Sequence, residues 1–359
     1  MSSATKERIV SSDSHVTVTH DAVKSNLASK FHEGYDAAVE QMGGGGVATR
    51  RGQNTMPFDL TKVNHAFGRP GTHDGKERLI DMDADGVDVE VLYCEFSAFR
   101  YLYLIKDGWR EATQAFNNTL ADFASVDPSR LICSYQIPIH DIDIAVAEVK
   151  RVAEIGGKSL QLPVHPPELG LPDYWERHWD PLWAAIQESG IPACFHIGLA
   201  NVTVYDPFPN DHAQGVVQPI AAFWTSIQYG NFIMGGVFER FPKLKCVFVE
   251  PGIGWFPWWL NNADQMVLDR GYSFPQITEL PSFYFKRNLF LTFIDEPESV
   301  KNLRHLMIDN IMWSTDYPHP ACSWPRSQEI IEAQFEGVPA DDRYKILSGN
   351  ADRVWNLSS

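Results

Sequence analysis

The chain has 359 residues, of which 44% are hydrophobic and 21% charged, and its formal net charge is −16. This acidic balance argues against nucleic acid and anionic membranes as partners, because both are bound by clustered Lys and Arg side chains. The sequence has no apolar run of the ~18 residues that span a bilayer, no secretory signal core near its start, and no CxxC pair among its five cysteines. We therefore expect a cytoplasmic protein with reduced thiols.

The first predicted element is a strand over residues 8–16, which carries Asp13-Ser-His15 near its end. Residues 17–75 follow without clear periodicity, although short helices are expected at 21–28 and 32–41. A structureless loop of this length is uncommon in a compact domain unless it has a function. The segment 17–75 is therefore predicted to be an insertion after the first strand that serves as a lid or a dimerisation arm.

A regular alternation of helices and strands begins at residue 76. Strands that alternate with helices predict right-handed crossovers and a parallel sheet. Eight such units at this length favour one domain with a (β/α)8 TIM barrel over an open sheet. The further strands are predicted at 87–93, 130–138, 159–163, 191–198, 244–250, 289–294 and from 310 onwards. The helices are predicted at 76–85, 109–126, 142–155, 179–189, 219–230, 235–241, in a Trp-rich stretch that ends at 268, at 297–305 and from 327 to the end.

Acidic and imidazole side chains follow several of these strands at the point where each ends. Active residues of a TIM barrel lie at the carboxyl ends of its strands, so these side chains are expected to converge. Asp13 and His15 are two residues apart on a strand, which points both to the same face. Mixed carboxylate and imidazole donors suit Zn²⁺, our first expectation, or Mn²⁺ or Fe²⁺. The candidate metal ligands are Asp13, His15, His196, Glu250 and Asp316, and the candidate catalytic residues are Asp316, Glu250 and His319.

Each candidate also has a purely structural interpretation. Asp13 and Asp316 could cap backbone amides at strand ends, and His196 could be a core histidine with satisfied hydrogen bonds. Glu250 could cap the next helix or orient a ligand histidine. Isolated buried charges are costly unless they are paired or bind a metal. The convergence of several such residues at one rim therefore favours the metal site.

Several motifs, taken together and in order, resemble the amidohydrolase superfamily. They are Asp13-Ser-His15, residues 78–88, Phe195-His196-Ile-Gly, residues 238–245, Glu250-Pro-Gly-Ile-Gly-Trp, residues 313–319 and Gly349-Asn-Ala. The resemblance is to the amidohydrolase-related branch, which includes aminocarboxymuconate-semialdehyde decarboxylase and the resorcylate-type decarboxylases. It implies one divalent metal held by Asp13, His15, His196 and Asp316. It also implies a homodimer by analogy.

One position departs from that resemblance. The decarboxylases of this branch have a histidine after the sixth strand, where this chain has Glu250. A carboxylate at this position could act as a base or bind a second metal. Decarboxylation by the same route as in those enzymes is therefore in question.

Four functions are open from the sequence. We expect first a metal-dependent hydrolase, in which a metal-activated water attacks the substrate, Asp316 carries the proton, and Glu250 or His319 orients the substrate. The alternative is non-oxidative decarboxylation of an aromatic or unsaturated acid. A nonheme diiron oxygenase is the third possibility, and an inactive barrel with a scaffold role is the fourth. Loops rich in Trp and Phe favour a small apolar or aromatic substrate.

Overall fold

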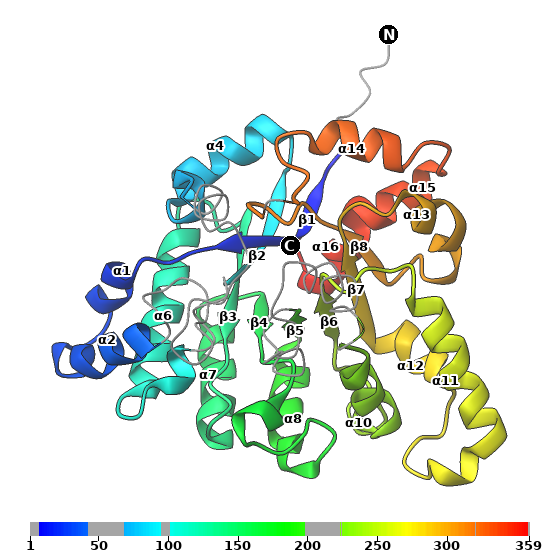
Figure 1. Cartoon of the computed structure of the whole chain (residues 1–359), viewed down its shortest axis with the longest axis horizontal. Coiled ribbons are helices and arrows are strands. Elements are labelled where there is room, and N and C mark those ends of the chain that lie inside the picture. The colour runs from blue at the N-terminus through cyan, green and yellow to red at the C-terminus, as the bar shows by residue number, and fades with distance from the viewer. Residues whose placement is uncertain are drawn as a thin grey trace, which may run out of the picture.

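The computed structural model describes residues 7–41, 68–94, 101–197, 223, 225–319 and 321–357. Within these residues eight strands form one parallel sheet, and each strand pairs with the next along the chain (Figure 1). All eight predicted strands are confirmed, mostly with shorter bounds. They are β1 (Val10–Val16), β2 (Val89–Cys94), β3 (Leu131–Gln136), β4 (Ser159–Gln161), β5 (Ala193–His196), β6 (Cys246–Val249), β7 (Leu289–Phe293) and β8 (Ile311–Trp313).

The first and last strands meet, which curls the sheet into a barrel. Ser14 forms an isolated parallel bridge with Tyr317, just beyond β8. The backbone N–H of His15 donates to the carbonyl of Tyr317 at 2.6 Å, and that of Asp316 donates to the carbonyl of Asp13 at 2.9 Å. The predicted (β/α)8 architecture is therefore confirmed. These closing contacts also bring the two ends of the sequence-derived candidate site together.

Helices surround the strands, as the outer ring of ribbons in Figure 1 shows. Asp74 caps the helix that precedes β2 by accepting from the N–H groups of Lys76 and Glu77, and Gly86 ends it at φ 76°. The helices are α1 (His20–Ser25), α2 (His32–Gln41), α4 (Gly75–Asp85), α6 (Trp109–Ala124), α7 (Ile142–Glu154), α8 (Asp180–Ser189), α10 (Val237–Arg240), α11 (Phe256–Arg270), α12 (Pro281–Asn288), α13 (Pro297–Leu303), α14 (Ser327–Gln334), α15 (Ala340–Tyr344) and α16 (Asn350–Trp355). Residues 225–234 are also helical.

One helix of the structure was not predicted. This helix is α12, whose sequence carries aromatic residues without a clear apolar stripe. The helices predicted from residue 327 onwards are confirmed as α14, α15 and α16, and a π-helical turn (Lys345–Gly349) separates α15 from α16. The helix predicted at 219–230 begins outside the described residues. In the segment 17–75 the helices α1 and α2 are present, but residues 42–67 lie outside the described part, so a lid or dimer arm stays a prediction.

The barrel interior is closed at the amino ends of its strands. Trp355 of α16 is buried and donates from Nε1 to the hydroxyl of Ser159, the first residue of β4, at 3.3 Å. Apolar side chains from β1, β2, β3, β5, β6, β7 and β8 pack with it in one interior cluster. Trp355 therefore fills the barrel interior from the amino side, away from the carboxyl ends of the strands where the candidate residues lie. No helix in the described part of the chain is long and apolar enough to span a membrane.

Candidate functional site

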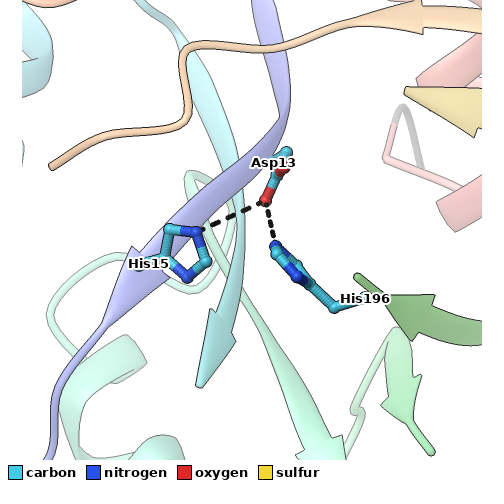
Figure 2. A group of neighbouring side chains, drawn as sticks. All are labelled: Asp13, His15 and His196. Carbon is cyan, nitrogen blue, oxygen red and sulfur yellow. Dashed lines mark ion pairs between the residues drawn. The ribbon is translucent and has the colours of Figure 1, made fainter. Parts of the chain in front are cut away.

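Three of the predicted ligands meet at the carboxyl ends of β1 and β5. Asp13 and His15 lie on β1, and His196 is the last residue of β5. Figure 2 shows the Asp13 carboxylate between the two imidazole rings. Its Oδ1 atom lies 3.3 Å from Nε2 of His196 and 4.0 Å from Nε2 of His15. All three side chains are buried, so these contacts between the carboxylate and the imidazole rings lie away from solvent.

The segment after β8 adds two more donors. The Oδ1 atom of Asp316 lies 3.0 Å from Nε2 of His15 and 3.9 Å from Nε2 of His319. The rings of His15 and His319 meet edge to face with their centroids 4.4 Å apart. His15 therefore stands between the two carboxylates, and the predicted convergence of Asp13, His15, His196 and Asp316 is what the structure shows.

Glu250 completes the cluster from the end of β6. One carboxylate oxygen of each of Glu250, Asp13 and Asp316 lies within 4.8 Å of the others. Glu250 and Asp316 both have positive φ, 62° and 58°, a conformation that is uncommon for residues other than glycine and that concentrates at functional sites. The Glu250 N–H donates to the hydroxyl of Thr292 on β7 at 2.8 Å, which holds this turn in place.

The chemistry of these donors fits a divalent cation. Both carboxylate oxygens of Asp13 and the Nε2 atom of His196 are buried and have no hydrogen-bond partner among the described residues. The other ring nitrogen of His196 lies 2.6 Å from the carbonyl of Ile197, so Nδ1–H donates there and Nε2 is the ring nitrogen that faces the Asp13 carboxylate. A buried carboxylate without donors is costly unless a cation lies beside it. Imidazole and carboxylate donors together suit Zn²⁺, Mn²⁺ or Fe²⁺.

The crowding of charges shifts the protonation of the cluster. Burial disfavours the imidazolium of His196, but the nearby Asp13 carboxylate outweighs this effect and raises the pKa of His196 to about 9. Burial raises the pKa of Glu250 to about 7, with His196 opposing the shift and Asp13 adding to it. Burial and the charge of His196 lower the pKa of His319 to about 3. Near neutral pH, His319 is therefore neutral and Glu250 is partly protonated.

Two weaker candidates lie outside the donor groups found among the described residues. His165, after β4, accepts through Nδ1 from the side-chain amide of Gln228 at 3.2 Å. The ring of His140 stacks between Tyr103 and Trp109, with centroids 4.1 and 4.5 Å away. Glu95, which directly follows the second strand in the sequence, lies outside the described residues.

Sequence reasoning did not single out three residues that support the site. Thr292 orients Glu250, as described above. Arg78 is fully buried and donates from Nη1 to the carbonyl of His15 at 2.9 Å. Gln161 is a buried carboxamide at the end of β4. Alternation along the strands could have indicated Thr292 and Gln161, because both occupy positions that face the barrel interior.

Comparison with known proteins assigns the family. Residues 63–357 match the family model described as amidohydrolase. The chain belongs to the amidohydrolase family. This membership agrees with the resemblance seen in the sequence motifs, and the matched range covers every strand of the barrel after β1.

Relatives within the family are decarboxylases. The γ-resorcylate decarboxylase of a Polaromonas species is 24% identical over 308 residues, which cover 79% of this chain and 90% of that enzyme. The 2-amino-3-carboxymuconate-6-semialdehyde decarboxylase of Dictyostelium discoideum is 24% identical over 279 residues, 76% of this chain and 74% of that enzyme. A 5-carboxyvanillate decarboxylase of Novosphingobium aromaticivorans, solved with manganese and 3-methoxy-4-hydroxy-5-nitrobenzoic acid, shares the fold. Its TM-score is 0.76 at 19% identity, covering 98% of this chain and 97% of that one.

Proposed function

We propose that this protein is a metal-dependent decarboxylase that removes the carboxyl group of a small aromatic acid. The observation that carries the proposal is the buried cluster of Asp13, His15, His196 and Asp316, found in a chain whose relatives are decarboxylases. Hydrolysis, the reaction expected first from the sequence, has weaker support than decarboxylation, because the relatives described above carry out the latter. The substrate class follows the aromatic acids in the names of two of those relatives, γ-resorcylate and 5-carboxyvanillate.

The proposed ligands are Asp13, His15, His196 and Asp316. Mn²⁺ is our first choice of cation, in place of the Zn²⁺ expected from the sequence, because the structurally similar decarboxylase contains manganese. When bound, the cation would supply positive charge that attracts the substrate carboxylate and stabilises negative charge in the transition state. The neutral imidazole of His319 would contact the substrate beside Asp316, since it lies at the edge of the donor cluster.

The reaction also requires a proton. The bond between the ring carbon and the carboxyl carbon breaks, carbon dioxide leaves, and the ring carbon gains a hydrogen. Glu250 is the proposed donor, because burial raises its pKa to about 7 and its carboxylic acid form is therefore present near neutral pH. Glu250 would then take the place of the histidine that the resembling decarboxylases have after the sixth strand. Asp316, the proton carrier expected for a hydrolase, is assigned here to the cation because it lies 3.0 Å from His15.

The test is a substrate survey with the manganese-loaded protein in the absence of oxygen. We expect release of carbon dioxide from 2,6-dihydroxybenzoate or 5-carboxyvanillate, and no cleavage of aryl esters or lactones. The variant Glu250→Gln should keep its metal. Its turnover rate should fall about 10²–10⁴-fold, which is the usual contribution of a general acid to the rate. Glu250→His is the matched control, and it should retain more activity than Glu250→Gln. Cleavage of esters with no carbon dioxide from any acid would contradict the proposal.

A nonheme diiron oxygenase is a second candidate, favoured by one specific observation. Glu250, Asp13 and Asp316 form a further donor group beside the histidines, so the cluster has enough ligands for two cations. Iron analysis of protein prepared without chelators decides between the two functions. Two irons per chain, together with oxygen consumption in the presence of an aromatic substrate, would favour the oxygenase over the decarboxylase.

A further inference from the structure

Gln161, the last residue of β4, has an amide whose orientation is fixed. Its Oε1 atom accepts from the backbone N–H of Cys94 at 3.1 Å and from the side-chain amide of Gln136 at 2.7 Å. A backbone N–H can only donate, so the atom that faces Cys94 must be the oxygen. The nitrogen Nε2 therefore points away from Cys94 and Gln136, with two N–H groups of its own.

Those two N–H groups have no acceptor among the residues that the structure describes. Gln161 is 1% exposed, and its Nε2 atom is buried without a hydrogen-bond partner among the described residues. Buried amide groups are almost always hydrogen-bonded, because an unpaired donor forfeits the bond it would make to water. A buried donor that no described residue satisfies is available to a bound ligand that offers an acceptor.

The position of Gln161 places this donor beside the candidate site. Two residues earlier on β4, the hydroxyl of Ser159 lies 3.3 Å from the sulfur of Cys194, which belongs to the interior cluster of the barrel. Side chains two apart on a strand share a face, so Gln161 faces the interior one layer above Ser159. His196 stands one layer above Cys194 on β5 in the same way. Gln161 and Cys194 are Cα partners in the pairing of β4 with β5, so Gln161 faces the interior one inward-facing position below His196, and Gln136 is its partner on β3.

We propose that Nε2 of Gln161 donates a hydrogen bond to an oxygen of the bound aromatic acid. This inference rests on the proposed function and narrows its substrate class. Because the group can only donate, it selects an acid whose ring carries a further oxygen acceptor, such as a hydroxyl, phenolate or methoxy group. The carboxyl group itself leaves during the reaction, so a contact to a ring oxygen persists from substrate to product and fixes the orientation of the ring.

The test compares binding of 2,6-dihydroxybenzoate to the manganese-loaded full-length protein and its variants by calorimetry, with metal content measured in parallel. Gln161→Met keeps the volume and removes the donor, together with the oxygen that accepts from Cys94 and Gln136. It should raise Kd about 10–100-fold with unchanged metal content, since a site built to hydrogen-bond its ligand discriminates strongly when the bond is lost. Ser134→Ala is the matched control. It removes the Ser134 hydroxyl, which bonds to Ser159 nearer the amino ends of the strands, and it should leave Kd unchanged.

The outcomes separate this inference from the proposed function. If Gln161→Met binds the acid within twofold of the wild type, a water molecule satisfies the amide and the inference is wrong. If the wild type does not bind the acid at all, the proposed ligand class is wrong. If the wild type binds the acid and releases no carbon dioxide, the proposed function fails, while the Gln161 contact is still judged from Kd. Should Gln161→Met not fold, Gln161→Asn withdraws the amide by one methylene and must weaken binding for the inference to stand.

Discussion

The Nε2 atom of His196 lies 3.3 Å from the Oδ1 atom of Asp13, although the two side chains come from β5 and β1, on different sides of the barrel. Neither atom has a hydrogen-bond partner among the described residues. With His196 protonated the two groups form a buried ion pair, and a divalent cation among the donors of the cluster would take the place of that proton. Asp316 and Glu250 approach the same place from β8 and β6. The account of function depends on this convergence.

Asp13→Asn is expected to abolish tight metal binding. The amide keeps the shape of the carboxylate but removes its charge, so the loss in metal affinity should exceed the ~10–100-fold that is usual for groups that only support a ligand. Elemental analysis after dialysis at graded metal concentrations measures it. Asp85→Asn is a suitable control, because Asp85 is a buried carboxylate that bonds to Ser327 instead. Equal metal content in the two variants would contradict the assignment of Asp13.

Thr292→Val should lower the turnover rate without loss of metal. The hydroxyl of Thr292 accepts the backbone N–H of Glu250 and so helps to hold that residue at positive φ. Removing the acceptor leaves a donor unsatisfied and should cost roughly 1–3 kcal/mol of unfolding free energy. Thr292→Ser keeps the hydroxyl and should remain close to the wild type. If the valine and serine variants have the same turnover rate, Thr292 does not position Glu250.

Arg78→Met should destabilise the fold strongly. The Arg78 guanidinium is completely buried, pairs with Glu90 and donates to the carbonyl of His15. Losing one partner of a buried ion pair leaves the other charge uncompensated, so we expect a loss of about 3–5 kcal/mol in denaturant unfolding. The double variant Arg78→Met/Glu90→Gln should recover part of that loss. Arg177→Met, at an exposed pair with Asp180, should change stability little. Additive losses in the double variant would argue against the pair.

His140 should make stability depend on pH. Burial between Tyr103 and Trp109 lowers the pKa of His140 to about 4, whereas an unfolded histidine titrates near its usual value of about 6.5. Between these values the unfolded state binds one proton more than the folded state, so the stabilisation is complete above pH 6.5 and is lost as the pH falls towards 4. Allowing for partial exposure, His140 contributes roughly 1–2 kcal/mol to this loss. His140→Phe should therefore lose less stability than the wild type between pH 7 and pH 5 in urea unfolding. Parallel curves for the two proteins would exclude His140 as the source.

The barrel and most of the donor cluster were predictable from the sequence. Glycines such as Gly86 mark helix ends, Asp13 lies at the middle of the first strand, and His196 and Asp316 stand where or just after β5 and β8 stop. The parallel order of the strands then requires those positions to share one rim. The local sequence pattern is therefore sufficient to predict the helix ends, the strand ends and the donor residues beside them.

Other parts of the site depend on contacts that local pattern does not contain. The pairing of Thr292 with Glu250, and of Gln161 with Gln136, requires the register between neighbouring strands. The reaction could not be predicted from the sequence either, because the same donors can support hydrolysis, decarboxylation or oxygen activation. Glu250 was recognised as the deciding position, but its proton affinity depends on burial among groups from other strands.

The most direct test is to run the reaction of the manganese-loaded protein with 2,6-dihydroxybenzoate in deuterated water without oxygen, and to examine the product by NMR and mass spectrometry. We predict 1,3-dihydroxybenzene with a single deuterium at the carbon that lost its carboxyl group, together with one equivalent of carbon dioxide, and a far slower reaction with Glu250→Gln. The account would be contradicted if none of the acids tested lost carbon dioxide while a hydrolysis product formed from an ester or lactone.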